Sequence, residues 1–168
     1  GDARSVLKAM LTLAGPQVAP SAWSQRAARE VGAWSDEHRS QLESNQIPIR
    51  PERLCAELSN NTPDDAIVVV DTGHAGMWMG GLFAARAGQS YLRSAGHLGW
   101  AFPAALGAKC GATDRPVVCF TGDSGFWYHV AEIETAVRWN LNAVIVVNNN
   151  SGGNQSKRGF DRVYGGTQ

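Results

Sequence analysis

Residues 117–126 have the sequence VVCFTGDSGF, an apolar run that gives way at once to small and polar residues. Residues 117–120 are continuously apolar and include β-branched valines, as expected for a strand buried on both faces of a parallel sheet. Residues 66–70 and 143–147 have the same character. With helices between these strands, the sequence predicts an α/β fold in which a parallel sheet carries helices on both faces.

Helices are expected between and ahead of these strands because apolar residues there recur at intervals of three and four. In the sheet region they are predicted over residues 75–87, 98–110 and 126–139, the last with an apolar stripe of Phe126, Val130, Ile133 and Val137. Ahead of it they are predicted over residues 5–13, ended by Gly15-Pro16, from Ser21 onward, and over residues 52–58 after Pro51.

The polar stretch of residues 44–50 has the composition of a linker. We interpret residues 1–50 as the end of a preceding domain with a helical linker, and residues 51–168 as the compact domain. The chain opens at Gly1 without an initiator methionine and ends shortly after Gly165-Gly166. We therefore expect a fragment or a processed chain whose last domain is incomplete at its C-terminal end.

The composition excludes several classes of function. Fifteen Lys and Arg balance fifteen Asp and Glu, which argues against nucleic acid or a membrane surface as the partner. No signal peptide is visible and no apolar run approaches the roughly 20 residues of a membrane span, so we expect a cytoplasmic protein. Cys55, Cys110 and Cys119 are widely spaced and are predicted to be buried free thiols rather than a disulfide framework or a metal cluster.

Polar residues and glycines follow each predicted strand: residues 71–76 are DTGHAG, residues 121–125 are TGDSG and residues 148–153 are NNNSGG. Ligands of parallel α/β sheets bind beyond the carboxyl ends of the strands, so these segments are expected to meet at one edge. Asp123 and Asn150 bring hard oxygen ligands of the kind that Mg2+ prefers. The N-terminus of the following helix favours an anion. Together these features predict a site for a metal and a diphosphate.

The order and spacing of these residues resemble a known cofactor motif. Gly122-Asp123 is followed by a helix, a buried strand and Asn149-Asn150, with Asp123 and Asn150 27 positions apart. This resembles the thiamine diphosphate motif of the superfamily of acetolactate synthase, pyruvate oxidase and benzoylformate decarboxylase, and is most similar to acetolactate synthase-like proteins. The resemblance runs from about Pro51 to the end of the chain, and implies a thiamine-diphosphate-binding fold with thiamine diphosphate and Mg2+ as cofactors.

The resemblance implies a role for each matching residue. Asp123 and Asn150 would coordinate Mg2+ by their side chains, and Gly152 by its backbone carbonyl. The diphosphate would be surrounded by the other residues of the strand ends, namely Thr72, Gly73, His74, Gly122, Ser124 and Gly125. Ser124 departs from the motif, in which glycine is commonest at this position.

A second segment, residues 96–105 with the sequence GHLGWAFPAA, is similar to the stretch that lies under the aminopyrimidine ring in this superfamily. Leu98 falls at the position of the large apolar side chain that keeps the cofactor bent. The Gly96 carbonyl would accept a hydrogen bond from the amino group of the ring. Both residues are therefore predicted to bind the cofactor.

The activity that the resemblance implies is attack by the thiazolium carbon of thiamine on a 2-oxo acid, with loss of carbon dioxide or transfer to an acceptor. Pyruvate is the expected substrate. The activating glutamate comes from a pyrimidine-binding domain in this superfamily, and no residue here matches it, so no catalytic residue is assigned to this chain. We expect that domain in another chain or in a missing part of the polypeptide, a dimeric or tetrameric assembly, and no activity of the chain alone.

Other functions remain open on the sequence. A decarboxylase of another 2-oxo acid, or of the oxalyl-CoA type, would use the same motif. A non-enzymatic relic of a cofactor domain would keep the fold without turnover. A serine hydrolase is suggested by Gly122-Asp123-Ser124-Gly125, although the nucleophile elbow requires Gly-x-Ser-x-Gly and Phe126 stands at its last position.

Overall fold

A computed structural model describes residues 1–14 and 19–166 of the chain. The chain divides into two compact units, residues 1–40 and 41–168, which are described separately. The first contains helix α1 (Ala3–Ala14) and most of helix α2 (Ala22–Leu42), which confirms two of the predicted helices. The predicted stop at Gly15-Pro16 lies outside the described residues. None of the described helices is both long enough and apolar enough to span a membrane.

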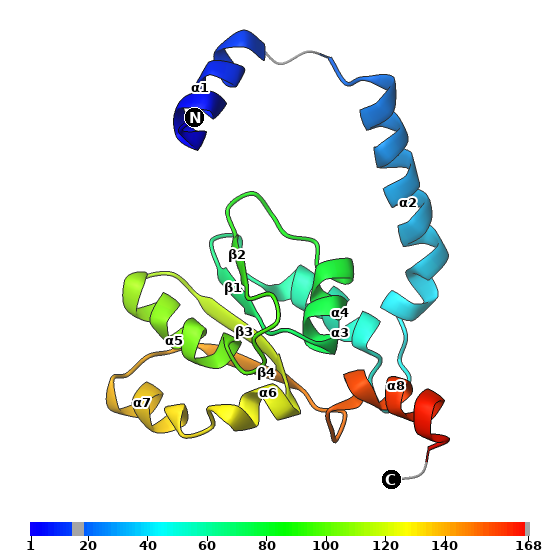
Figure 1. The fold of residues 1–168 in the computed structure, drawn as a ribbon, viewed down its shortest axis with the longest axis vertical. Helices are drawn as coiled ribbons and strands as arrows, with labels where there is room; N and C mark the ends of the chain where they lie inside the picture. Colours follow the sequence, from blue (N-terminus) through cyan, green and yellow to red (C-terminus); the bar gives the residue numbers. More distant parts are fainter. Residues whose placement is uncertain (15–18, 167–168) are drawn as a thin grey trace. The chain divides into compact units, whose positions relative to one another are not determined.

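The second unit is built on a four-stranded, all-parallel sheet, which confirms the predicted α/β fold (Figure 1). The strand order is β2-β1-β3-β4. The strands are β1 (Ile67–Val70), β2 (Ser90–Arg93), β3 (Val117–Gly122) and β4 (Val144–Asn148).

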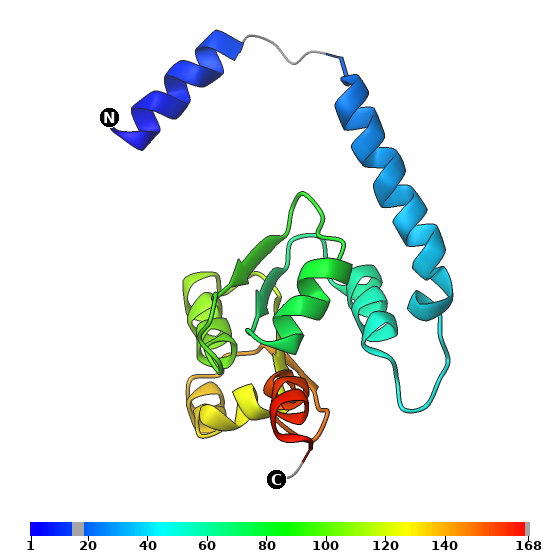
Figure 2. The same ribbon diagram turned by 45° about the vertical axis from the view of Figure 1, so that its right-hand side comes forward.

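Helices cover both faces of this sheet, as predicted (Figures 1 and 2). Successive side chains of a strand point to opposite faces, so β1 contributes Ile67 and Val69 to one core and Val68 and Val70 to the other. The first core lies against α5 (Ala101–Gly111) and α7 (Glu132–Arg138), and the second against α3 (Pro51–Asn61) and α4 (His74–Leu82).

Two edge strands differ from the sequence prediction. Strand β2 was not predicted, because its four residues are SYLR and three of them are exposed. The prediction that β4 is buried on both faces is wrong, since Val144 is exposed and the rest of the strand is only half-buried. Each of these strands pairs with a neighbour on one side only, so neither has the continuous burial of β1.

Three predicted helices have different bounds in the structure. Helix α4 ends at Leu82 rather than Ala87, because Arg86 leaves the helical path to bond the backbone carbonyls of Ser59 and Thr62 and the carboxylate of Asp64. Helix α5 begins at Ala101 rather than at residue 98, because Gly99 has a φ of +87°, which no α-helix contains.

The predicted helix over residues 126–139 is two helices, α6 (Asp123–Tyr128) and α7. The break lies at residues 129–131, where the N–H groups of Glu132 and Ile133 bond carbonyls three residues back and tighten the turn. The predicted apolar stripe is divided as a result, and Val137 is 76% exposed.

Helix α8 (Asn154–Tyr164) was not predicted, although Phe160, Val163 and Tyr164 have helical spacing and Gly165 ends the helix in a left-handed conformation. The three cysteines are free, as predicted. Cys55 and Cys119 are buried, but the prediction of burial is wrong for Cys110, which lies on the exposed face of α5.

Candidate functional site

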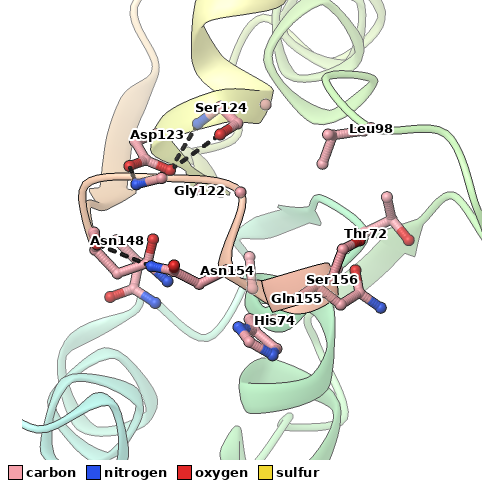
Figure 3. Close-up of a pocket in the computed structure, with 16 residues that line it drawn as sticks. Thr72, His74, Leu98, Gly122, Asp123, Ser124, Asn148, Asn154, Gln155 and Ser156 are labelled. Carbon is pink, nitrogen blue, oxygen red and sulfur yellow. Dashed lines mark hydrogen bonds between the residues drawn. The ribbon is translucent and has the colours of Figure 1, made fainter. Parts of the chain in front are cut away.

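A pocket of about 210 Å³ lies at the carboxyl ends of β1, β3 and β4. In Figure 3, Asp123 and Ser124 lie on one side of it and Thr72 on the other, with Leu98 between them in this view. Ten of the eleven residues predicted for the cofactor site line the pocket: Thr72, Gly73, His74, Leu98, Gly122, Asp123, Ser124, Gly125, Asn150 and Gly152. The structure therefore brings together segments that are up to 80 positions apart in the sequence.

Gly96 is the one predicted residue that does not line the pocket. It lies next to it, because its backbone N–H donates a hydrogen bond to Thr72 Oγ1 at 3.2 Å. Its φ of +91° is one that glycine adopts without strain. The loop of residues 94–100 is thereby joined to the β1 side of the pocket.

Asp123 is fixed by two backbone N–H groups. Ser124 N–H donates to Oδ1 at 2.7 Å, and Gly152 N–H donates to Oδ2 at 2.7 Å. Such bonds to a charged acceptor are short and strong, and they tie the end of β3 to the loop after β4. A carboxylate has about four lone-pair positions, so these two bonds leave acceptor capacity directed at the pocket.

The two asparagines after β4 have different partners. The Asn149 side-chain oxygen accepts a hydrogen bond from Ser151 N–H at 2.8 Å, which commits it to the local turn. Asn150 lines the pocket, and among the described residues its side-chain amide has no hydrogen-bond partner, while its backbone carbonyl accepts one from Asn154 at 3.0 Å. Asn150 rather than Asn149 is thus available to a ligand.

The donor set at this end of the pocket fits a small hard cation. Asp123 and Asn150 offer side-chain oxygens, and the Gly152 carbonyl, which accepts one hydrogen bond from Asn154 N–H at 2.8 Å, has a second lone pair. The described part of the chain contains no cluster of three or more His, Cys, Asp and Glu. One carboxylate with neutral oxygens is the kind of set that Mg2+ shares with phosphates and water.

Three helices begin at the pocket: α4 after Gly73, α6 after Gly122 and α8 after Gly153. Each N-cap residue is a glycine, and no side chain caps any of the three. The first N–H groups of a helix have no partner within it, and the helix dipole makes this end attractive to anions. Here Ser124 N–H and Asn154 N–H bond Asp123 and the Gly152 carbonyl, which leaves the other first N–H groups for a ligand. The pocket can therefore hold an anion through backbone donors, although no Lys or Arg is among its described lining residues.

Six lining residues had not been assigned to the site: Ala75, Asn148, Gly153, Asn154, Gln155 and Ser156. The first three lie within the segments predicted to meet at this edge, and the other three lie outside them. Asn154, Gln155 and Ser156 form the first turn of α8 and were not predicted because the helix itself was not predicted. The spacing of Phe160 and Tyr164, whose rings stack at 5.7 Å, was the signal that could have identified it. Gln155 lies against Gly73, since a Cβ at Gly73 would stand 3.1 Å from its side-chain oxygen.

The surroundings of Ser124 do not support nucleophilic catalysis. Its hydroxyl lies 3.5 Å from Asp123 Oδ1, and within the described structure it makes no hydrogen bond to a histidine. A nucleophilic serine needs an adjacent base that accepts its proton. The hydrolase interpretation therefore lacks its second residue.

Comparisons with known proteins agree with this geometry. A family model described as the C-terminal TPP-binding domain of thiamine pyrophosphate enzymes matches residues 71–168. A probable acetolactate synthase of Mycobacterium bovis is 30% identical over 98% of the chain, and the acetolactate synthase isozyme 3 large subunit of Escherichia coli is 28% identical over 99%. A probable acetolactate synthase large subunit of Methanococcus aeolicus is 29% identical over 89%. The chain spans 27–30% of the length of these relatives.

Proposed function

The chain belongs to the family of C-terminal thiamine-pyrophosphate-binding domains of thiamine pyrophosphate enzymes, and on this premise we propose that it provides the diphosphate and Mg2+ half of an active site acting on 2-oxo acids. The family assignment supports the predicted cofactor, thiamine diphosphate with Mg2+. The reaction we propose is decarboxylation or carboligation of a 2-oxo acid, with pyruvate as the substrate. The observation that carries the proposal is the convergence of the N-termini of α4, α6 and α8, each with a glycine at its N-cap, on a pocket with one carboxylate.

In this proposal Mg2+ is held by the side chains of Asp123 and Asn150 and by the Gly152 carbonyl. The diphosphate lies against the first turns of α4, α6 and α8, where backbone N–H groups of the two glycine-rich loops around Gly73 and Gly125 are available. Gln155 and Ser156 extend the site beyond the residues that the sequence indicated.

The charges of the pocket imply that the metal is required for cofactor binding. A diphosphate brings negative charge close to Asp123, and the described lining residues include no Lys or Arg to offset it. Helix N-termini contribute only about half a positive charge each. A divalent cation between Asp123 and the diphosphate turns this repulsion into attraction.

When bound, thiamine diphosphate supplies the nucleophilic carbon and stabilises the negative charge that decarboxylation leaves. The residues of this chain position it. Leu98, which is 42% exposed beside the pocket, would press against the body of the cofactor, and Gly96 would accept a hydrogen bond from its pyrimidine ring. The loop of residues 94–100 would thus set how the ring end lies relative to the diphosphate end.

The rest of the active site would come from elsewhere. A pocket of about 210 Å³ is smaller than the 300–1,000 Å³ usual for a whole small-molecule ligand. We propose that a pyrimidine-binding domain, in another chain or another part of the same polypeptide, covers the exposed ring end and supplies the activating glutamate. The chain alone would then be inactive, and the working assembly would be a dimer or a tetramer. The three free cysteines are consistent with a cytoplasmic location.

Acetolactate synthase-like carboligation is the preferred reaction because the matching relatives are named as acetolactate synthases. Decarboxylation of another 2-oxo acid, or of an oxalyl-CoA type substrate, is the second candidate, since it would use the same diphosphate site. A non-enzymatic relic is disfavoured because the Asp123 and Asn150 oxygens are both kept at the pocket. Product analysis with pyruvate separates these cases: acetolactate indicates carboligation, acetaldehyde indicates decarboxylation, and neither indicates another substrate or a relic.

The cofactor proposal is tested by calorimetric titration of thiamine diphosphate into the complete assembly, with and without Mg2+. We expect binding only with Mg2+, and a loss of affinity of about a hundredfold or more in Asp123→Ala, since the variant loses a charged metal ligand. Asp114→Ala is the matched control, because Asp114 is exposed and lies outside the pocket. Mg2+-independent binding, or equal binding by Asp123→Ala, would overturn the metal assignment.

A further inference from the structure

A second carboxylate lies beneath the pocket and has no part in the proposed function. Asp71 follows β1 directly and is 0% exposed. It accepts hydrogen bonds from Thr72 N–H at 2.9 Å and from Thr121 Oγ1 at 2.8 Å, and Gly99 N–H lies 3.1 Å from both of its oxygens. A buried carboxylate is costly unless it is hydrogen-bonded, and here three donors compensate it.

The three donors lie in three different segments, each of which contributes residues to the pocket lining. Thr72 lines the pocket on the β1 side, and Gly99 directly follows Leu98 in the loop of residues 94–100. Thr121 precedes Gly122-Asp123 at the end of β3. One carboxylate therefore joins the two walls around the diphosphate to the loop that carries Leu98.

Close packing leaves no room for a side chain at Gly125, beside the carboxylate, or at Gly99, in the loop that bonds it. A Cβ at Gly125 would lie 2.2 Å from Asp71 Oδ2, and a Cβ at Gly99 would lie 2.9 Å from Tyr128 Cβ and 3.0 Å from the Gly125 carbonyl. Gly99 also has a φ of +87°, which favours glycine. A side chain at Gly125 would therefore displace the Asp71 carboxylate, and a side chain at Gly99 would collide with α6.

The negative charge of Asp71 cannot itself attract a diphosphate, and in the described structure Asp71 forms no ion pair with Lys or Arg. Its contribution must be geometric. We propose that Asp71 is a positioning residue that holds the Leu98 loop in register with the diphosphate walls, so that both ends of one cofactor molecule can be bound at once. This inference rests on the proposed function, because it takes thiamine diphosphate as the ligand that reaches both walls.

The test compares two probes in the complete assembly: thiamine diphosphate with Mg2+, which contacts the diphosphate walls and the Leu98 loop, and inorganic diphosphate with Mg2+, which contacts the diphosphate walls alone. In Asp71→Ala the three donors lose their acceptor. We expect the dissociation constant for thiamine diphosphate to rise about tenfold or more, and that for inorganic diphosphate to change by less than about threefold.

Three further variants control the comparison. Asp71→Asn keeps an acceptor for Thr72 and Gly99, so we expect it to restore most of the affinity that Asp71→Ala loses. Thr121→Val removes one of the three donors and replaces Asp71→Ala in the test if that variant does not fold. We expect its dissociation constant for thiamine diphosphate to rise about two- to fivefold, with that for inorganic diphosphate nearly unchanged. Asp65→Ala changes an exposed aspartate outside the pocket, and both affinities should stay unchanged.

The outcomes separate the inference from the proposed function. Selective loss of thiamine diphosphate affinity, with rescue by Asp71→Asn, supports positioning. Unchanged affinity, or equal loss for both probes, overturns it and leaves the cofactor site intact. If the unsubstituted assembly binds neither probe, the proposed function fails and the inference fails with it.

Discussion

Gly125→Ala tests whether the packing around Asp71 is as tight as the geometry indicates. The new Cβ would lie 2.2 Å from Asp71 Oδ2, which is 1.2 Å inside the 3.4 Å at which ordinary contact begins. It would also lie 3.0 Å from Thr121 Oγ1. The carboxylate cannot retreat freely, because three donors hold it, so the substitution has to break a hydrogen bond or shift the first turn of α6.

The size of the effect follows from these two costs. A lost hydrogen bond to a charged group costs about 1.5–3 kcal/mol, and overpacking a filled site costs about 1–3 kcal/mol. If both costs apply, Gly125→Ala should lower the free energy of unfolding by about 2.5–6 kcal/mol, a large share of the 5–15 kcal/mol typical of a domain.

Gly107→Ala is the matched control. Gly107 lies within α5 and is exposed, and a Cβ there would meet nothing within 4 Å. The substitution should raise the free energy of unfolding by about 0.5–1 kcal/mol, because glycine is a poor helix former. Urea titrations of the full chain, followed by tryptophan fluorescence, measure both variants. If Gly125→Ala lowered the free energy of unfolding by less than about 1 kcal/mol while Gly107→Ala raised it as expected, the packing argument would be refuted.

Three further predictions concern the glycine loop and the thiols. Gly73→Ala should lower the free energy of unfolding by about 1–3 kcal/mol, because Gly73 has a φ of 74° and a ψ of −151°, a conformation essentially restricted to glycine, and its Cβ would press on Gln155. The variant should also bind thiamine diphosphate more weakly in the assembly; unchanged calorimetric affinity would contradict this. A thiol reagent at pH 8 should label Cys110 in the native chain and should label Cys55 and Cys119 only after unfolding, since both of these are buried and burial raises the pKa of each to about 12. The same raised pKa values mean that from about pH 9 upward the folded protein keeps thiol protons that the unfolded chain loses. The free energy of unfolding should therefore be constant from pH 7 to 8 and should fall as the pH rises toward 12, less steeply in Cys119→Ala. Urea titrations across this range would show a flat profile if the reasoning were wrong.

The sequence predicted the fold class and most of the pocket because the signals for both are local. A buried parallel strand appears as a short apolar run, and the residues that follow it must lie at the sheet edge where ligands bind. Asp123 and Asn150 each stand within such a segment, so their convergence required only the topology. Leu98 follows no predicted strand and was identified through the resemblance of residues 96–105. Their roles as ligands of a metal or cofactor remain predictions until binding is measured.

The errors lie where tertiary contacts override local pattern. Nothing in residues 83–89 shows that Arg86 will bond the carbonyls at the end of α3, and this interaction ends α4 early. The turn at residues 129–131 divides a segment whose apolar spacing alone fits one helix. Strand β2 is exposed and has no apolar run, so only its pairing with β1 identifies it.

The two aspartates of the site show most clearly what spacing alone cannot decide. Asp71-Thr72-Gly73 and Asp123-Ser124-Gly125 have the same pattern of aspartate, hydroxyl residue and glycine after a strand, and in both the next N–H bonds the aspartate Oδ1. The register separates them. Val70 pairs with Phe120, and Asp71 N–H bonds the Phe120 carbonyl, so the register continues to Asp71 and places it beside buried Thr121. Asp123 comes two residues after Thr121 and therefore lies farther out toward the edge of the sheet. The deeper carboxylate is saturated by protein donors and shapes the pocket, whereas the outer one retains oxygens for a ligand. One pattern thus gives a structural residue and a proposed metal ligand, and the pairing of β1 with β3 determines which is which.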